Sequence, residues 1–161
     1  DVYKRQDIKA LLEEMKDVLG ATHPDRRILL RLSADRRISG DYRELYSAVS
    51  NLVQNAMKYS AEDTPVTVGW RVGPDGYYLS VRDQGIGIDQ AHLPRLTERF
   101  YRVDDSRCSA TGGTGLGLAI VKHVAASHGA RLEIESEPGK GSTFTLVFPP
   151  ESSVEKVSMA E

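Results

Sequence analysis

The sequence predicts an α+β fold, a two-layer α/β sandwich in which three helices cover one face of a mixed sheet of about five strands. Three segments space their apolar residues at helical intervals, and two pairs of segments alternate apolar and polar residues around turns that contain glycine. A chain of 161 residues, 40% of them hydrophobic, is long enough for one domain with its own core. We therefore expect one domain over residues 1–150 and a polar, disordered tail over residues 151–161.

The first half of the chain is predicted to contain two helices and a strand. Residues 7–19 show the i, i+3, i+4, i+7 spacing of an amphipathic helix, which Gly20 should end. Residues 27–32, RILLRL, are expected to form a strand, and residues 41–59 a helix with Asp41 as its N-cap. The apolar residues of the first helix are Ile8, Leu11, Leu12, Met15, Val18 and Leu19. Those expected on the buried face of the second are Leu45, Val49, Leu52 and Ala56.

Two hairpins are predicted in the second half. Residues 66–72 and 77–81 alternate apolar and polar side chains on either side of the turn GPDG. Residues 132–134 and 144–148 do the same around EPGKGS. Because both turns contain proline and glycine, each pair of segments is expected to form antiparallel strands.

A long irregular segment separates these hairpins. We expect residues 83–114 to be irregular apart from a short helix at 89–96, and residues 116–128 to form the third long helix, ended by Gly129. We expect His123 to pack against the core, because it is in phase with the apolar residues of this helix.

Composition excludes several classes of protein. A formal net charge of -2 is not typical of a general nucleic-acid binder, and the apolar runs are shorter than the ~20 residues needed to span a bilayer. There is no signal-peptide pattern, and the single cysteine, Cys108, cannot form an internal disulfide. Because the chain begins at Asp1 without a methionine, we interpret it as part of a longer protein.

A polar stripe follows the second predicted helix. Asn51, Asn55 and Lys58 lie about a third of a turn from its apolar face. Such a stripe can be an ordinary solvated surface. It also suits a magnesium nucleotide, since Mg²⁺ prefers oxygen ligands and lysine binds phosphate as a point charge.

Asp83 ends the second strand of the first hairpin, in phase with its apolar residues. Its carboxylate should therefore point inward and need a partner. Gly85 and Gly87 follow and allow a flat ligand to approach the backbone. A carboxylate only accepts hydrogen bonds, which suits the amino group of adenine. The alternative is an aspartate that caps a loop.

A glycine-rich run, TGGTGLGL, precedes the third helix. It does not follow a strand directly, as a Rossmann loop would, and GKGS at 139–142 lacks the Gly-Lys-Ser/Thr of a P-loop. What remains is a loop whose backbone N–H groups lead into a helix N-terminus, where anions are favoured. Arg99, Arg102 and Arg107 precede it, either as an ordinary charged surface or as part of a lid over phosphate.

These motifs, in this order, resemble the ATP-binding domain of sensor histidine kinases, within the wider group that includes gyrase, Hsp90 and MutL. NLVQNAMKYS is similar to the N box of that family, DQGIG to its G1 box and ERFYR to its F box. GGTGLGLAIVKH is similar to the G2 box, and GKGSTF to the last glycine motif. The resemblance runs from about residue 7 to residue 149 and is strongest to the phosphate-regulon sensor kinases.

The resemblance implies a site for ATP and Mg²⁺. Asn55 would coordinate magnesium with Asn51 beside it, and Lys58 would contact phosphate. Tyr59 would lie against the adenine ring, and Asp83 would bind the adenine amino group.

The resemblance also implies a lid over the phosphates. Arg102 and Arg107 would reach the terminal phosphates, and Phe100 would anchor the lid. The implied catalytic residues are Asn51, Asn55, Lys58 and Arg102. The adenine pocket would be shaped by Gly85 and Gly87, and the loop would bind phosphates through Gly113, Thr114, Gly115, Leu116 and Gly117.

The implied activity is that of a protein-histidine kinase. It would transfer the γ-phosphoryl group of ATP to a histidine on a dimerisation domain absent from this chain, and a response regulator would act downstream. None of the four histidines (His23, His92, His123 and His128) lies in the family's acceptor pattern. The resemblance further implies a cytoplasmic domain of a homodimeric protein anchored in a bacterial inner membrane, with no nucleic-acid partner.

Two other functions stay open. Relatives that hydrolyse ATP carry a water-activating glutamate where this chain has Asn51, and an amide is a poor general base. An ATP-hydrolysing conformational switch would need such a base. A catalytically inactive module that binds ATP or a protein partner would keep the fold without the reaction.

Overall fold

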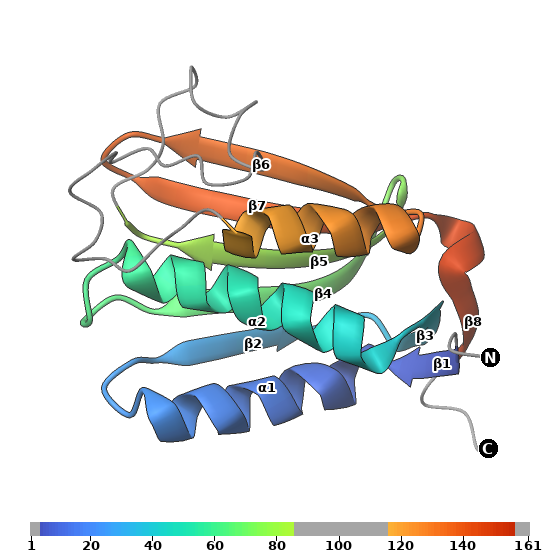
Figure 1. Cartoon of the computed structure of the whole chain (residues 1–161), viewed down its shortest axis with the longest axis horizontal. Coiled ribbons are helices and arrows are strands. Elements are labelled where there is room, and N and C mark those ends of the chain that lie inside the picture. The colour runs from blue at the N-terminus through green and yellow to red at the C-terminus, as the bar shows by residue number, and fades with distance from the viewer. Residues whose placement is uncertain (1–3, 86–115, 157–161) are drawn as a thin grey trace.

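The computed structural model describes residues 4–85 and 116–156. It confirms the two-layer sandwich: three helices lie on one face of a five-stranded sheet of order β2-β4-β5-β7-β6 (Figure 1). The pair β2 and β4 is parallel and the other neighbours are antiparallel, so the sheet is mixed. The helices are α1 (Ile8–Thr22), α2 (Tyr42–Lys58) and α3 (Leu116–Ser127). The strands are β2 (Ile28–Leu32), β4 (Val66–Gly73), β5 (Gly76–Asp83), β6 (Arg131–Glu137) and β7 (Gly141–Phe148).

A second, smaller sheet was not predicted. It has the order β1-β3-β8, with β1 at Lys4–Asp7, β3 at Arg36–Gly40 and β8 at Ser153–Lys156, which follows a 3-10 turn at Pro150–Ser152. Residues 153–156 are therefore a strand and not the disordered tail expected there, whereas residues 157–161 lie outside the described part. These three short strands are rich in charged and polar residues, and they pair through their backbones without the alternation that identifies a strand in a sequence.

The helix ends differ in part from the prediction. Gly20 does not end α1, which continues to Thr22 and is closed by the N–H of His23 donating to the carbonyl oxygen of Leu19. Asp41 is the N-cap of α2, as predicted: its carboxylate accepts from the N–H groups of the next turn. Gly129 follows α3 with φ of +67°, a conformation that glycine adopts without strain.

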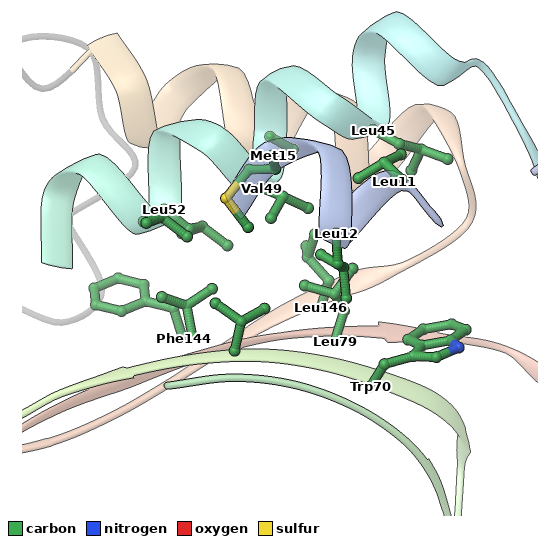
Figure 2. Packing of buried hydrophobic residues seen from close by; sticks show 14 of the residues in the cluster. Leu11, Leu12, Met15, Leu45, Val49, Leu52, Trp70, Leu79, Phe144 and Leu146 are labelled. Carbon is green, nitrogen blue, oxygen red and sulfur yellow. The ribbon is translucent and has the colours of Figure 1, made fainter. Parts of the chain in front are cut away.

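The core lies between the helices and the sheet (Figure 2). All four apolar residues predicted on the inner face of α2 are buried. The apolar stripe of α1 is also buried except for Val18, which is 47% exposed and lies at the edge of that stripe. The labelled residues from α1 and α2 are Leu11, Leu12, Met15, Leu45, Val49 and Leu52, and those from the sheet are Trp70, Leu79, Phe144 and Leu146.

Candidate functional site

The predicted site residues come from elements that end on one side of the sandwich. The C-terminal end of α2, the C-terminal end of β5 and the N-terminal end of α3 all lie at the end opposite β1 and β8 (Figure 1). Because α2 also packs against both α3 and β5, residues far apart in the sequence are brought to one place. The fold therefore assembles the N-box and G1-box segments at a common edge.

The polar stripe of α2 faces away from the core. Asn51 and Asn55 are half-buried, whereas Lys58 is exposed in the last turn of the helix. The Nδ2 of Asn51 donates to the carbonyl oxygen of Ser47 at 2.7 Å and lies 3.3 Å from its hydroxyl. This bond orients the Asn51 amide along the helix, so its oxygen is the polar group that a ligand could use.

The end of α2 lies directly against the segment that follows β5. The N–H of Tyr59 donates to the carbonyl oxygen of Asn55 at 3.2 Å and closes the helix. A Cβ added to Gly85 would lie 2.0 Å from the carbonyl oxygen of Tyr59. Only a glycine allows this approach, so the sequence Asp83-Gln84-Gly85 joins two elements of the site in addition to its predicted role in shaping a pocket.

Asp83 is buried, with 5% of its surface exposed, as its phase in β5 predicts. Its Oδ1 accepts a hydrogen bond from the N–H of Gly85 at 2.8 Å. Burial raises the pKa of the Asp83 carboxyl, because a charge is less stable away from water, while backbone N–H groups of Gly85 and Ser142 act in the opposite direction. The structure thus supplies partners for a buried carboxylate.

A pair of serine hydroxyls beside Asp83 was not predicted. Ser142 is opposite Asp83 in the β5–β7 register and is 6% exposed. Its hydroxyl lies 2.7 Å from that of Ser136, which also donates to the carbonyl oxygen of Gly141 at 3.1 Å. The signal was present in the motif GKGSTF, whose pairing with β5 could have placed Ser142 beside the carboxylate.

The last glycine motif packs on the same aspartate. Gly141 has φ of +121°, and a Cβ there would lie 2.2 Å from the carbonyl oxygen of Asp83. A side chain would be strained at this position and would also displace the backbone of β5. The structure therefore brings the G1-box aspartate and the last glycine motif into direct contact.

Several predicted site residues lie outside the described part of the chain. They are Gly87, Phe100, Arg102, Arg107, Gly113, Thr114 and Gly115, as is the helix predicted at residues 89–96. Leu116 and Gly117 form the first residues of α3, with side chains that are not described. Within residues 4–85 and 116–156, Asn55, Lys58, Tyr59, Asp83 and Gly85 lie at or near the ends of α2 and β5, whereas Asn51 lies in the middle of α2.

The prediction that His123 packs in the core is wrong, because it is exposed. The residues buried here are Val121, Val124 and Ala125 of α3 and His128 directly after the helix, whereas Ile120, in phase with His123, is 41% exposed. His128 is 7% exposed, and its Nε2 accepts from the N–H of Asp41 at 3.0 Å. The buried histidine is therefore His128, which directly follows α3 and links the end of this helix to the N-cap of α2.

Two features are absent from the described residues. Among residues 4–85 and 116–156, no three His, Cys, Asp or Glu side chains are grouped closely enough to hold a metal ion. No helix in these ranges is long and apolar enough to cross a membrane.

Comparison with known proteins identifies the family. The model for the histidine kinase-, DNA gyrase B- and HSP90-like ATPases matches residues 40–152. The phosphate regulon sensor protein PhoR of Pseudomonas aeruginosa is 54% identical over 145 residues, which are 89% of this chain and 33% of that protein. The sensor-like histidine kinase SenX3 of Mycolicibacterium smegmatis is 50% identical over 113 residues, 70% of this chain and 29% of SenX3. The chain thus spans about a third of the length of these curated relatives.

Solved structures agree with this assignment. The mycobacterial sensor histidine kinase MprB superimposes with a TM-score of 0.79 at 27% identity, covering 92% of this chain and 97% of that one. The nucleotide-free catalytic domain of the histidine kinase ThkA superimposes with a TM-score of 0.78 at 20% identity, and the match covers 92% of this chain and 97% of the ThkA chain. At this identity the likeness supports the fold alone. The chain belongs to the histidine kinase-, DNA gyrase B- and HSP90-like ATPase family, and it corresponds to the catalytic ATP-binding domain of the sensor histidine kinases.

Proposed function

We propose that this chain binds Mg-ATP at the edge where α2 and β5 end, and that it donates the γ-phosphoryl group to a histidine outside the chain. The observation that carries the proposal is the buried carboxylate of Asp83, held beside Gly85 at the end of α2. Burial of a carboxylate costs free energy, and such groups are often found at functional sites.

Asp83 is proposed to select adenine. An ionised carboxylate only accepts hydrogen bonds, so it favours the exocyclic amino group of adenine and disfavours the carbonyl group that guanine carries at the same position. The buried Ser142 is opposite this carboxylate in the β5–β7 register, and its hydroxyl and that of the half-buried Ser136 offer further polar groups. Tyr59, which is half-buried at the end of α2, would cover the ring from one side.

Asn55 is proposed as the magnesium ligand of the chain, with Asn51 beside it and Lys58 at the phosphates. These residues fit the ion, because Mg²⁺ takes few protein oxygens together with phosphate and water. When bound, the ion would neutralise charge on the phosphates. Arg102, Arg107, Phe100, Gly87 and the loop residues 113–117 are proposed for the lid and the adenine pocket on the family motifs alone.

The proposed reaction is transfer to a protein and not hydrolysis. Phosphoryl transfer depends mainly on positioning and charge neutralisation, and Asn51 lacks the basicity needed to activate water. The relatives are named as sensor kinases, and a full-length relative, ShkA, has been solved in complex with AMPPNP. The likeness to PhoR supports a role in phosphate-regulon signalling.

The wider partners are proposed from the relatives, because this chain covers about a third of their length. The acceptor histidine would lie on a dimerisation domain of the same protein, and a response regulator would receive the phosphoryl group. The complete protein would be a homodimer anchored in a bacterial inner membrane, with this domain in the cytoplasm.

Calorimetry of the chain with ATP, ADP and GTP, each with and without Mg²⁺, tests the binding half of this proposal. ATP and ADP should bind and GTP should bind much more weakly, with magnesium strengthening the binding of ATP. Equal binding of ATP and GTP would contradict selection by Asp83, and no binding of any nucleotide would contradict the proposed function itself.

A further inference from the structure

The last turn of α2 is closed by groups from outside the helix. The final carbonyl oxygens of a helix have no partner within it. The Nη1 of Arg26 donates to the carbonyl oxygen of Met57 at 2.6 Å, and its Nη2 donates to the hydroxyl of Ser60 at 2.7 Å. The Ser60 hydroxyl donates in turn to the carbonyl oxygen of Ala56 at 2.6 Å. One guanidinium therefore satisfies the carbonyl oxygen of Met57 and also holds the Ser60 hydroxyl that satisfies the carbonyl oxygen of Ala56.

Arg26 is itself firmly placed, although it lies in the connection between α1 and β2. Its N–H donates to the carbonyl oxygen of His23 at 3.0 Å, which closes a turn. The next residue, Arg27, accepts from the N–H of Val66 at 2.9 Å, where β2 and β4 begin to pair. The planar guanidinium, on a backbone anchored on both sides, can hold two acceptors in a defined geometry.

The position of the guanidinium has an electrostatic reason as well. The C-terminal end of a helix carries a partial negative charge, which a cation stabilises. The Nε of Arg26 is buried and has no hydrogen-bond partner within residues 4–85 and 116–156. The Nε–H group of Arg26 is therefore left without a hydrogen bond, while its Nη1 and Nη2 groups make the two that close the helix.

This turn carries the residues proposed to hold the nucleotide. Lys58 and Tyr59 lie between Met57 and Ser60, the two residues that Arg26 contacts. The carbonyl oxygen of Tyr59 also lies against Gly85. The turn is therefore held by Arg26 and by the segment that follows Asp83.

We propose that Arg26 is a positioning residue for the nucleotide site, acting through the last turn of α2 and not through contact with the ligand. This inference rests on the proposed function, because it assumes that Lys58 and Tyr59 meet ATP. Without the guanidinium, the last turn can fray, and Lys58 and Tyr59 lose the fixed arrangement that binding requires.

Arg27 provides a matched control. It is adjacent and carries the same charge, but it is exposed and its Nη2 donates to the carbonyl oxygen of Asp63, beyond the end of α2, at 2.9 Å. Removal of either arginine changes the net charge equally. Only removal of Arg26 takes a donor away from a carbonyl oxygen of α2, that of Met57.

The test compares Arg26→Ala, Arg26→Lys, Ser60→Ala and Arg27→Ala with the wild type by calorimetry with Mg-ATP and by amide hydrogen exchange. Arg26→Ala should weaken Mg-ATP binding about tenfold or more, equivalent to about 1.4 kcal/mol. It should also speed exchange of the Tyr59 N–H relative to that of Val53, in the middle of α2. Arg26→Lys keeps the positive charge but lacks the planar pair of Nη donors, so it should recover only part of the affinity for Mg-ATP. Ser60→Ala should cause a smaller loss, and Arg27→Ala should stay within about twofold of the wild type.

The outcomes separate this inference from the proposed function. A wild type that binds no ATP overturns both. A wild type that binds ATP, with Arg26→Ala binding equally well, overturns only the inference, as does an equal loss in Arg27→Ala. If Arg26→Ala does not fold, Ser60→Ala tests the inference in its place. Unchanged affinity for Mg-ATP and unchanged exchange of the Tyr59 N–H in Ser60→Ala would overturn the proposal that the last turn of α2 positions the nucleotide site.

Discussion

Gly85 lies against the carbonyl oxygen of Tyr59, so closely that a Cβ on Gly85 would be 2.0 Å from that oxygen. The contact joins the end of β5 to the end of α2, and with them the buried carboxylate of Asp83 to the polar stripe of α2. The same Cβ would lie 2.8 Å from the Oδ1 of Asp83. One small residue therefore sets the distance between the two halves of the proposed site.

Gly85→Ala should accordingly separate these two elements. Because the new methyl group meets backbone and not a flexible side chain, the free energy of unfolding should fall by about 1–3 kcal/mol. Mg-ATP affinity should fall by at least about tenfold. Urea unfolding and calorimetry measure the two effects.

Gly20→Ala is the matched control for this substitution. Gly20 lies in α1, and a Cβ there would have no heavy atom within 4 Å. The change should leave binding unaltered and stabilise the protein by about 0.5–1 kcal/mol, since alanine favours a helix more than glycine does. Wild-type ATP affinity in Gly85→Ala would contradict the assigned role of the contact.

Asp83→Asn should separate binding from stability. The raised pKa of Asp83 means that the folded protein holds the proton of this carboxyl more tightly than the unfolded chain does. Its contribution to stability is therefore fully present below the unfolded pKa of about 4 and is lost as the pH rises through the folded pKa. Asparagine does not ionise, so the variant should gain stability relative to the wild type as the pH rises from about 3 to about 7. Its ATP affinity should nevertheless fall by at least about tenfold, since a hydrogen bond to a charged group is lost.

Urea unfolding at a series of pH values, together with calorimetry at neutral pH, checks this prediction. A wild type that gains stability over the variant as the pH rises would mean that ionised Asp83 stabilises the fold. Unchanged ATP affinity in the variant would remove Asp83 from the site.

His128→Ala should destabilise the fold far more than His123→Ala. The Nε2 of His128 accepts from the N–H of Asp41, so its Nδ1, 2.8 Å from the carbonyl oxygen of Val124, carries the proton. Truncation leaves a backbone N–H and a carbonyl oxygen without this partner and opens a cavity, at a cost of about 2 kcal/mol or more. His123 is exposed, and its removal should change the free energy of unfolding by less than about 0.5 kcal/mol. Equal effects in urea unfolding would show that His128 does not tie α3 to α2.

The long elements could be predicted from the sequence because each carries a periodic signal. The helical spacing of apolar residues in α1 and α2, and their alternation with polar residues in β4 and β5, indicate directly which faces are buried. The strands β1, β3 and β8 could not be predicted, because backbone pairing between short polar segments leaves little pattern. In α3 nearly every residue of the first turns is apolar or glycine, so the pattern did not show which stripe is buried, and His123 was chosen in place of His128.

The site could be predicted as residue types but not as contacts. The motif spacing pointed to Asn55, Lys58, Asp83 and Gly85. The hydroxyl pair at Ser136 and Ser142 depends on the β6–β7 and β5–β7 registers, and the contact of Arg26 with α2 joins residues 31 positions apart. Such relationships follow from tertiary packing, which a single sequence does not display.

Incubation with γ-labelled ATP, alone and with the dimerisation domain proposed to carry the acceptor histidine, tests the central claim most directly. The chain alone should bind ATP without becoming labelled and without appreciable release of phosphate, because none of its four histidines lies in the family's acceptor pattern and Asn51 is a poor general base. Mixed with the dimerisation domain, it should label that domain through an acid-labile, base-stable bond, slowly because no linker holds the two parts together. Rapid phosphate release by the chain alone would contradict this and indicate an ATPase, and ATP binding with no labelling at any concentration of the acceptor would indicate a catalytically inactive module.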